Sequence, residues 1–560
     1  MASKSFFTEQ ITGLYNGVST QPDLMRLENQ ADEQINFIPD ISRGLESRNG
    51  TELIRPIEAT SNITSNSFIT KIDKNTKSVD VSTEDGTEAV QFTDDYIVCF
   101  TGQEHDSETN QDGAIEIFDK NGVKQEFTNP SDDANDYIVT TTPNKSIRTA
   151  LIEDYMIVLN TEKVTAMKDV LSSPANNDNT AAIVVEGNPG DDITIIVQKK
   201  DNPAKTITTS GITSSSTFTQ IATEIKDAFD QTDGASGTFA TNTSLQVTLD
   251  RNIVKLKAID PNVDITEYTL FVRDPDFGGF VEFDTDTSVT GGSNPSASTT
   301  ANLKTISRGS INVINQKLQK ASDLPKLGSL DGYVVNIVGI DEQNTLANYY
   351  VKWSAKKQIW EETIEPGLKH QIDETTMPHF LIKTGQTAAG VGKFQFVAAG
   401  DSSLTNQRSA KSYSDRLVGD DDSNPIPSFI NKRIVDISFF RNRLVYLGED
   451  SLVMSRSNDY FNLFSSSAIS TRNDDPIDIF IGTNFSVLPR FMEQYQGGII
   501  VFTENAQFVV YSADQSLTPA TVRLEKITDY KVNEDVHPVR LGENTYFADS
   551  LGNNAVIRKY

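Results

Sequence analysis

The chain has 560 residues, with 49 Lys and Arg against 78 Asp and Glu, which gives a formal net charge of −29. Because one hydrophobic core rarely serves more than roughly 250–300 residues, this length predicts several domains. Stable DNA binding needs Lys and Arg to neutralise phosphates, so this acidity argues against such a protein. The charge indicates either a surface that stays soluble or one past which DNA moves without adhering.

The sequence does not support a membrane-spanning, secreted or disulfide-bonded protein. The longest apolar run, residues 333–340, is far shorter than the roughly 20 residues that cross a bilayer. The first residues lack the uninterrupted apolar core of a signal peptide, so we expect folding in a cytoplasm. Cys99 is the only cysteine, which leaves neither an intrachain disulfide nor a cysteine-based metal site.

The first 170 residues predict mostly short strands. Residues 1–54 are expected to form loop, short helix and strand, and residues 55–170 the first part of a β-rich body. Apolar segments bounded by turn residues predict strands at 68–72, 78–82, 96–100, 114–118, 137–141 and 156–159. This spacing favours a sandwich, barrel or propeller, and no sequence repeat singles out the propeller.

Two polar stretches, 171–180 and 285–301, are expected linkers around an inserted α+β domain over 183–290. Thr217–Asp230 predicts an amphipathic helix, because Phe218, Ile221, Ala222, Ile225 and Phe229 share one face at helical spacing. Strands are expected around it at 183–185, 193–197, 245–249, 253–258 and 268–273. Strands packed with one helix make a small α+β module.

Residues 302–560 predict the second part of the β-rich body. A short helix is expected around 311–321, followed by strands at 333–339, 349–353 and 359–363. In the last two of these strands, Trp353 and Trp360 are placed to pair across a hairpin.

The stretch 436–482 carries the densest pattern. It predicts strands at Ile437–Leu447 and Ser451–Ser455, an aromatic segment at 459–464, a turn at Asn473–Pro476 and a strand at 477–481. The order of the motifs FFRNRL, SRSNDYFN and DDPID resembles the tail tubular protein B family, the tail nozzle proteins of short-tailed bacteriophages. The signature residues are Arg441, Asn442, Arg443, Asp474, Asp475 and Pro476, with Gly17, Gln21, Pro22, Arg26, Asn36 and Arg48 near the N-terminus.

The resemblance implies a mainly β subunit with a propeller-like body, six copies of which form a ring at the distal end of a phage tail. It implies a mechanical role without catalysis or cofactor, in which the ring retains the genome and then conducts it during ejection. The implied partners are other copies of the chain, the tail adaptor (tail tubular protein A), the tail fibres, the host cell envelope, and phage DNA that passes without specific binding. The implied location is the virion tail, assembled in the host bacterial cytoplasm.

Family members continue beyond the equivalent of Ile557–Tyr560, where this chain stops inside a β pattern. We therefore expect either a truncated product or a shorter variant whose missing part is supplied otherwise.

Several other motifs suggest ligands only weakly. Glu108, Asn110 and Asp112, with Asp119 behind them, are similar to a calcium loop, but an ordinary surface loop needs the same residues. The four histidines, His105, His370, His379 and His537, lack metal-site spacing. The glycine-rich segment 385–394 lacks the spacing and the Ser or Thr of a phosphate-binding loop, so a plain glycine turn is expected.

Two alternatives to a mechanical role stay open from the residues. A capsule-degrading glycosidase needs two carboxylates, and Asp420–Asp422 and Asp474–Asp475 supply pairs that are also ordinary turn and cap residues. A host-receptor adhesin would use the segment 183–290. The run Phe439–Arg443 fits nucleic-acid contact less well than a structural role in which its arginines pair with carboxylates.

Overall fold

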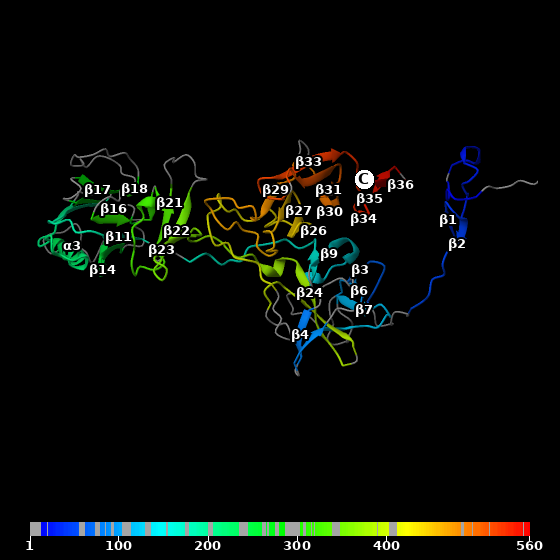
Figure 1. The fold of residues 1–560 in the computed structure, drawn as a ribbon, viewed down its shortest axis with the longest axis horizontal. Coiled ribbons are helices and arrows are strands. Elements are labelled where there is room, and N and C mark those ends of the chain that lie inside the picture. The colour runs from blue at the N-terminus through cyan, green and yellow to red at the C-terminus, as the bar shows by residue number, and fades with distance from the viewer. Residues whose placement is uncertain are drawn as a thin grey trace, which may run out of the picture. The chain divides into compact units, whose positions relative to one another are not determined.

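The computed structural model is mainly β (Figure 1), as the sequence predicts. The chain separates into two compact units, residues 1–61 with 121–123, and residues 62–120 with 124–560. The structure describes residues 13–19, 21–54, 62–72, 79–83, 86–90, 95–103, 114–128, 136–152, 155–173, 179–199, 205–233, 245–259, 265, 268–274, 279–285, 303–305, 310–314, 316–318, 320–338, 348–388, 390–401, 411–482, 487–495, 497–514, 516–552 and 554–560. Within these ranges, no helix is long and apolar enough to cross a membrane.

The first unit is small and has little regular structure. A 3₁₀ turn, η1 (Asp23–Met25), precedes a hairpin of two four-residue strands, β1 (Phe37–Asp40) and β2 (Gly44–Ser47). A parallel bridge between Val18 and Ala31 closes the loop that contains η1. Within residues 13–19 and 21–54, the part of the unit that the structure describes, one closed loop and one hairpin are present.

The second unit opens with a three-stranded and a five-stranded sheet that share a core, and it also contains a two-stranded sheet. β3 (Phe68–Ile72), β6 (Tyr96–Phe100) and β7 (Ile115–Asp119) form one sheet, and β4 (Val79–Thr83) pairs with β5 (Gly86–Val90). A five-stranded sheet has the order β8 (Glu126–Thr128), β25 (Gly392–Val397), β24 (His379–Gln386), β10 (Tyr155–Asn160) and β9 (Ile147–Ile152), with the short helix α2 (Pro143–Ser146) before β9. The predicted strand at 137–141 is wrong, because residues 136–138 form a turn of helix.

The strands from Thr180 to Ile314, which extend beyond the second expected linker, form two sheets, with one helix. One sheet has the order β14 (Leu245–Asp250), β15 (Ile253–Ala258), β11 (Thr180–Val185) and β19 (Ile311–Ile314). The other has the order β13 (Lys205–Thr208), β12 (Thr194–Lys199), β16 (Tyr268–Asp274), β17 (Gly279–Thr285) and β18 (Leu303–Thr305). The helix is α3 (Phe218–Asp233), close to the predicted range.

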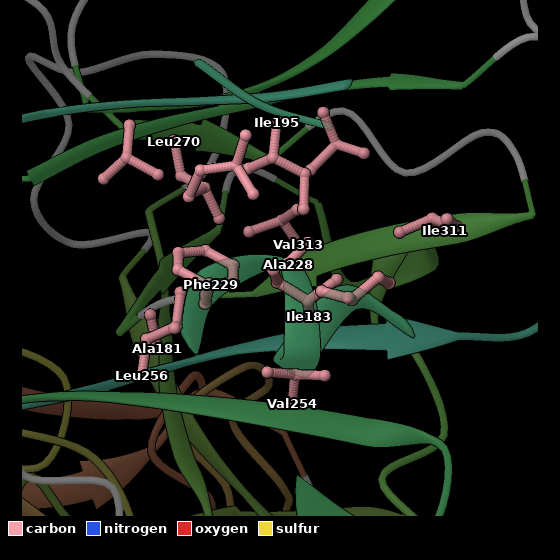
Figure 2. Close-up of a cluster of buried hydrophobic side chains, with 14 of the residues drawn as sticks. Ala181, Ile183, Ile195, Ala228, Phe229, Val254, Leu256, Leu270, Ile311 and Val313 are labelled. Carbon is pink, nitrogen blue, oxygen red and sulfur yellow. The ribbon is translucent and has the colours of Figure 1, made fainter. Parts of the chain in front are cut away.

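Helix α3 buries the face that its periodicity predicts. Ile221, Ala222, Ile225 and Phe229 are buried among strands of both sheets, whereas Phe218 remains 44% exposed at the first turn. Figure 2 shows Phe229 and Ala228 lying among Ala181, Ile183, Leu256 and other apolar side chains of the same core.

Further strands continue this block along the chain. β20 (Lys317–Leu318), β21 (Val334–Ile337), β22 (Tyr349–Ser354) and β23 (Ile359–Thr363) form a sheet, with the 3₁₀ turn η3 (Ala321–Asp323) between the first two. Its core includes Val335 and Trp353 together with Ala182 and Ile253 of the preceding sheet. The predicted pair of Trp353 and Trp360 is confirmed, with ring centroids 5.5 Å apart.

The helix predicted around 311–321 is wrong. That segment forms β19 and β20 instead, because its β-branched residues alternate in a way that fits a buried strand. The predicted boundaries of the inserted domain, 183–290, remain a prediction. The pairing of β11 with β19 and the shared core carry one continuous block of strands from Thr180 to Thr363.

The 3₁₀ turn η5 (Glu374–Thr376) lies just before β24. From Ile434 onward, the described strands form three consecutive antiparallel meanders. They are β26 (Ile434–Phe440) to β27 (Arg443–Gly448), β28 (Ser451–Met454) and β29 (Ile477–Phe480); β30 (Pro489–Tyr495) to β31 (Gly498–Thr503), β32 (Gln507–Ser512) and β33 (Val522–Thr528); and β34 (Val539–Leu541) to β35 (Asn544–Leu551) and β36 (Asn554–Lys559). The edge strand β26 packs against the edge strands β9 and β30 of neighbouring sheets. Such meanders are consistent with the expected propeller-like body, which stays a prediction.

Candidate functional site

The motif FFRNRL forms a tight hairpin turn. Arg441 and Asn442 both have positive φ, 45° and 58°, and they join Phe440 to Arg443 across the turn between β26 and β27. Positive φ at both central residues is what a two-residue hairpin turn of the primed type requires. The single strand predicted over 437–447 is therefore wrong, because this turn divides it.

Arg443 is the centre of the signature cluster. Its side chain is 1% exposed, and the guanidinium donates to the backbone carbonyls of Ser455 (2.7 Å), Asp475 (2.7 Å) and Asn473 (2.9 Å). Burial lowers the pKa of Arg443, although nearby Asp474 and Asp475 act against this shift. We expected carboxylate partners for this arginine, and the structure shows carbonyl partners instead.

The motif DDPID lies against the same hairpin. The Asp475 carboxylate is almost fully buried and accepts from the backbone N–H groups of Arg472 (2.6 Å) and Ser466 (3.1 Å). Asp474 pairs with Arg456 of the motif SRSNDYFN, and this bond lowers the pKa of Asp474. Pro476 then precedes the first residue of β29.

Together these contacts hold the segment 456–476 to the β26–β27 turn. Asn442 donates from its amide to Oδ1 of Asn458 (2.9 Å), and the Asn458 N–H donates to the Asn442 carbonyl (2.9 Å). Within the same segment, Ala468 donates its N–H to Glu362 at the end of β23 (2.8 Å). Three motifs that are separate in sequence thus form one polar cluster whose bonds serve the fold.

The N-terminal signature residues lie in the first unit, where they shape its loop and hairpin. Gly17 has φ of 73°, and its carbonyl accepts from the N–H of Ala31 (2.8 Å). The Pro22 carbonyl accepts from Met25 N–H to close η1. Arg26 donates to the carbonyl of Gln21 (3.2 Å) and to Asp32 (2.7 Å). The hairpin closes with Asn36, at φ of 62°, whose carbonyl accepts from Arg48 N–H (2.8 Å).

A second site, which no sequence pattern predicts, is a cavity where β9, β26 and β30 meet the segment 534–537. It has two adjoining compartments of about 420 and 460 Å³, which share Lys145, Arg148 and Phe491 in their walls. Most charged groups at its rim are paired, as Lys145 with Asp535 (2.5 Å) and Arg433 with Glu449 (2.7 Å). The cavity thus combines an apolar floor with a rim of ion pairs.

His537 lies in this cavity between two carboxylates. Its Nε2 is 3.4 Å from Oδ2 of Asp436, and its Nδ1 is 2.8 Å from the Pro538 carbonyl and 3.5 Å from Oε1 of Glu493. Burial lowers the pKa of His537, but the bonds to Asp436 and Pro538 outweigh this effect and leave it raised. Burial also raises the pKa of Glu493. With acceptors at both ring nitrogens, the protonated imidazole fits this site best.

Comparison with known proteins decides the family. The model of the family described as "Bacteriophage nozzle protein" matches residues 4–269 and 281–560. The chain belongs to the bacteriophage nozzle protein family. It is also 25% identical over 560 residues to the tail tubular protein gp12 of Escherichia phage T7, an alignment that covers 99% of this chain and 59% of that relative. The chain thus spans well under two thirds of the length of the curated relative it matches.

In this nozzle-family chain, the residues of the other ligand sites considered from the sequence either take part in strands and turns or lie outside the described residues. Glu108, Asn110, Asp112 and His105 are outside them, whereas Asp119 is in β7. The segment 385–394 connects the antiparallel strands β24 and β25, as a plain turn does. Asp420 accepts from the N–H and hydroxyl of Ser423 (both 2.8 Å), so it caps a turn.

The remaining described histidines, His370 and His379, make different contacts. The His379 ring stacks on Tyr137 with centroids 4.0 Å apart, and burial lowers the pKa of His379 to about 4. His370 lies 3.9 Å from Asp415. Within the described ranges, no three His, Cys, Asp or Glu side chains come together in a way that would hold a metal ion.

Proposed function

We propose that this chain is a structural subunit of the tail nozzle of a short-tailed phage. Six copies form a ring around the DNA channel at the distal tail, retain the packaged genome and conduct it during ejection. The observation that carries the proposal is the match of the nozzle family over nearly the whole chain. The name of the T7 relative, a tail tubular protein, supports the same role.

The geometry of the signature cluster supports a mechanical role without catalysis. Arg443 and Asp475, which the sequence marks most strongly, are buried and engaged with backbone groups. Asp420 caps a turn, and Asp474 is paired with Arg456. A glycosidase would need two carboxylates facing a substrate cleft, and these pairs serve turns and loops instead.

The partners of the nozzle follow from the same role. The ring docks on the tail adaptor (tail tubular protein A), lies close to the tail fibres and reaches the host cell envelope. DNA passes through the lumen without specific binding, because a chain of net charge −29 repels a phosphate backbone. Basic residues along the lumen would contradict this part of the proposal.

Negative-stain electron microscopy of the protein mixed with its adaptor tests the proposal. We expect sixfold rings with a central hole, stacked on adaptor rings, and the adaptor alone serves as the control. Chains that never join the adaptor would overturn the nozzle role. Depolymerisation of host polysaccharide by the purified chain, or cell binding by it, would then favour the glycosidase or the adhesin.

A further inference from the structure

The first unit exposes nearly all of its large apolar side chains. No residue in the described ranges 13–19 and 21–54 is buried. Leu24 is fully exposed, and Ile41 and Leu53 are 87% and 80% exposed. The complete set of exposed large apolar residues in these ranges is Tyr15, Val18, Leu24, Met25, Leu27, Ile35, Phe37, Ile38, Ile41, Leu53 and Ile54. An apolar set of this size without a core marks an interaction surface.

Local polar bonds nevertheless give this unit a definite shape. Arg26 bonds to Asp32 at 2.7 Å, and Asp40 accepts from the N–H groups of Ser42 (2.8 Å) and Arg43 (2.9 Å) at the hairpin turn. The Ser42 hydroxyl also donates to Asp40 (2.6 Å), and this bond together with the two backbone bonds lowers the pKa of Asp40. These polar bonds form within the unit, whereas its large apolar side chains are exposed.

A unit of this kind is not stable by its own packing. An isolated two-stranded hairpin is at best marginal in water, and three or more strands or a packing partner are needed. Burying the exposed apolar side chains would remove on the order of 800 Å² from water, which is about the area that each partner contributes to a stable protein–protein interface. The unit therefore offers one complete half of an interface.

We propose that this unit docks on a second copy of the same chain and joins neighbouring subunits of the ring. The inference rests on the proposed ring function. A ring of identical copies needs a head-to-tail interface, so both halves must be present on each chain. The unit supplies one half, and it is acidic in composition, with seven Asp and Glu against three Arg and no Lys in residues 13–54.

The rest of the chain has an exposed surface of complementary character. In the sheet β34–β36, Val539, Tyr546 and Lys559 are aligned across the three strands, and Ile557 pairs with Ala548 on the same face. Val539, Leu541 and Ile557 are 52%, 62% and 78% exposed, and Lys559 is exposed beside them. An apolar face with a basic residue suits a unit that exposes apolar side chains and is acidic in composition.

Zero-length carbodiimide crosslinking tests the inference directly. The reagent joins carboxylates to lysines, and Lys4 is the only lysine in residues 1–61 and 121–123, so every crosslink from residues 13–54 to any other lysine leaves the unit. Full-length chains labelled with ¹⁴N and ¹⁵N are mixed before assembly, and crosslinked peptides are read by mass spectrometry. Mixed-isotope peptides from Asp23, Glu28 or Asp40 support docking on a second copy. Only same-isotope peptides, or none in assembled rings, would overturn it.

Substitution in the full chain gives a second readout. Replacing Leu24, Ile35 and Ile41 by Ser is expected to raise the protein concentration for half-assembly at least about tenfold in mass photometry. The matched control, L24M with I35V and I41V, keeps the surface apolar and should assemble as the parent does. Equal assembly of the serine variant and the control would contradict the inference. If rings form but the unit crosslinks within its own copy, only this inference fails; if no rings form, the proposed function fails first.

Discussion

Arg443 is a fully buried cation whose charge is met by three carbonyl oxygens from two segments of the chain. Ser455, Asn473 and Asp475 each provide a carbonyl within 2.9 Å of the guanidinium. Without the side chain, these acceptors would remain buried and unpaired, which costs more than the loss of an exposed bond. The residue thus matters for the loop 456–476 as well as for the hairpin.

Arg443→Ala should destabilise this sheet by about 3 kcal/mol or more. We expect faster hydrogen–deuterium exchange in residues 456–476 and a lower midpoint of urea unfolding. Arg433→Ala is the matched control, because Arg433 is 54% exposed and its bond to Glu449 should contribute less than about 1 kcal/mol. Equal effects of the two substitutions would contradict the role assigned to Arg443.

His537 should make the attachment of the segment 534–541 depend on pH. The folded-state pKa of His537 is raised above its ordinary value, so its stabilising bonds are fully present below about pH 6.5 and are lost as pH rises through the folded pKa. Exchange protection of residues 534–541, corrected for intrinsic rates, should fall as pH rises above about 6.5 and through the raised pKa of His537. His537→Gln should remove that fall. Parallel curves for the two proteins would refute this assignment.

His379 changes the folding stability with pH in the opposite direction to His537. Its folded-state pKa is about 4, below the value in the unfolded chain, so the unfolded chain binds the proton first as pH drops. His379 therefore lowers stability as pH falls below about 6.5 towards 4. The two histidines act in different windows, and the measurement for His537 is cleanest above pH 6.5.

At the scale of elements, hydrophobic periodicity predicted secondary structure correctly where a local residue pattern alone determines the element. The spacing of Ile221, Ile225 and Phe229 predicted helix α3, and the tryptophans of β22 and β23 pair as expected. The β26–β27 turn was missed because Arg441 and Asn442 adopt positive φ without a glycine to signal it. Strand β19 was missed, and a helix was expected in its place, because its burial against β11 depends on partners far away in sequence, as in the pair Ile183 and Val313, 130 positions apart.

Ile225→Ala tests whether α3 holds the block of strands from Thr180 to Thr363 together. Ile225 is fully buried between the helix and both sheets, so the substitution should cost about 2–5 kcal/mol of local stability. Exchange protection should fall across α3, β11 and β15 and stay unchanged in β30–β33. Asp227→Ala, on the exposed side of the same helix, is the control and should change little. A loss of protection confined to α3 would show that the strands do not depend on the helix.

At the scale of the whole molecule, the order of three motifs carried the family, whereas their geometry could not be read from the chain. The sequence placed Arg443 and Asp475 in one signature but gave no reason for carbonyl rather than carboxylate partners. The cavity around His537 brings together Arg148, Asp436 and residues 534–537, which no local pattern connects. Contacts between residues far apart in sequence form both the Arg443 cluster and the His537 cavity. Patterns within short sequence windows do not predict such contacts.

The net charge of −29 leads to a prediction for the assembled nozzle. Proteins that bind DNA gain affinity by releasing counterions from phosphates, and that affinity falls steeply with salt. An acidic chain has no such term, so a fluorescent duplex should show no saturable binding to assembled rings, even at about 50 mM salt, where electrostatic attraction is least screened. Fluorescence anisotropy measures this, with a basic DNA-binding protein as the positive control. Saturable binding that weakens with added salt would mean that basic side chains converge on the channel despite the overall charge, and the DNA would then be held rather than only conducted.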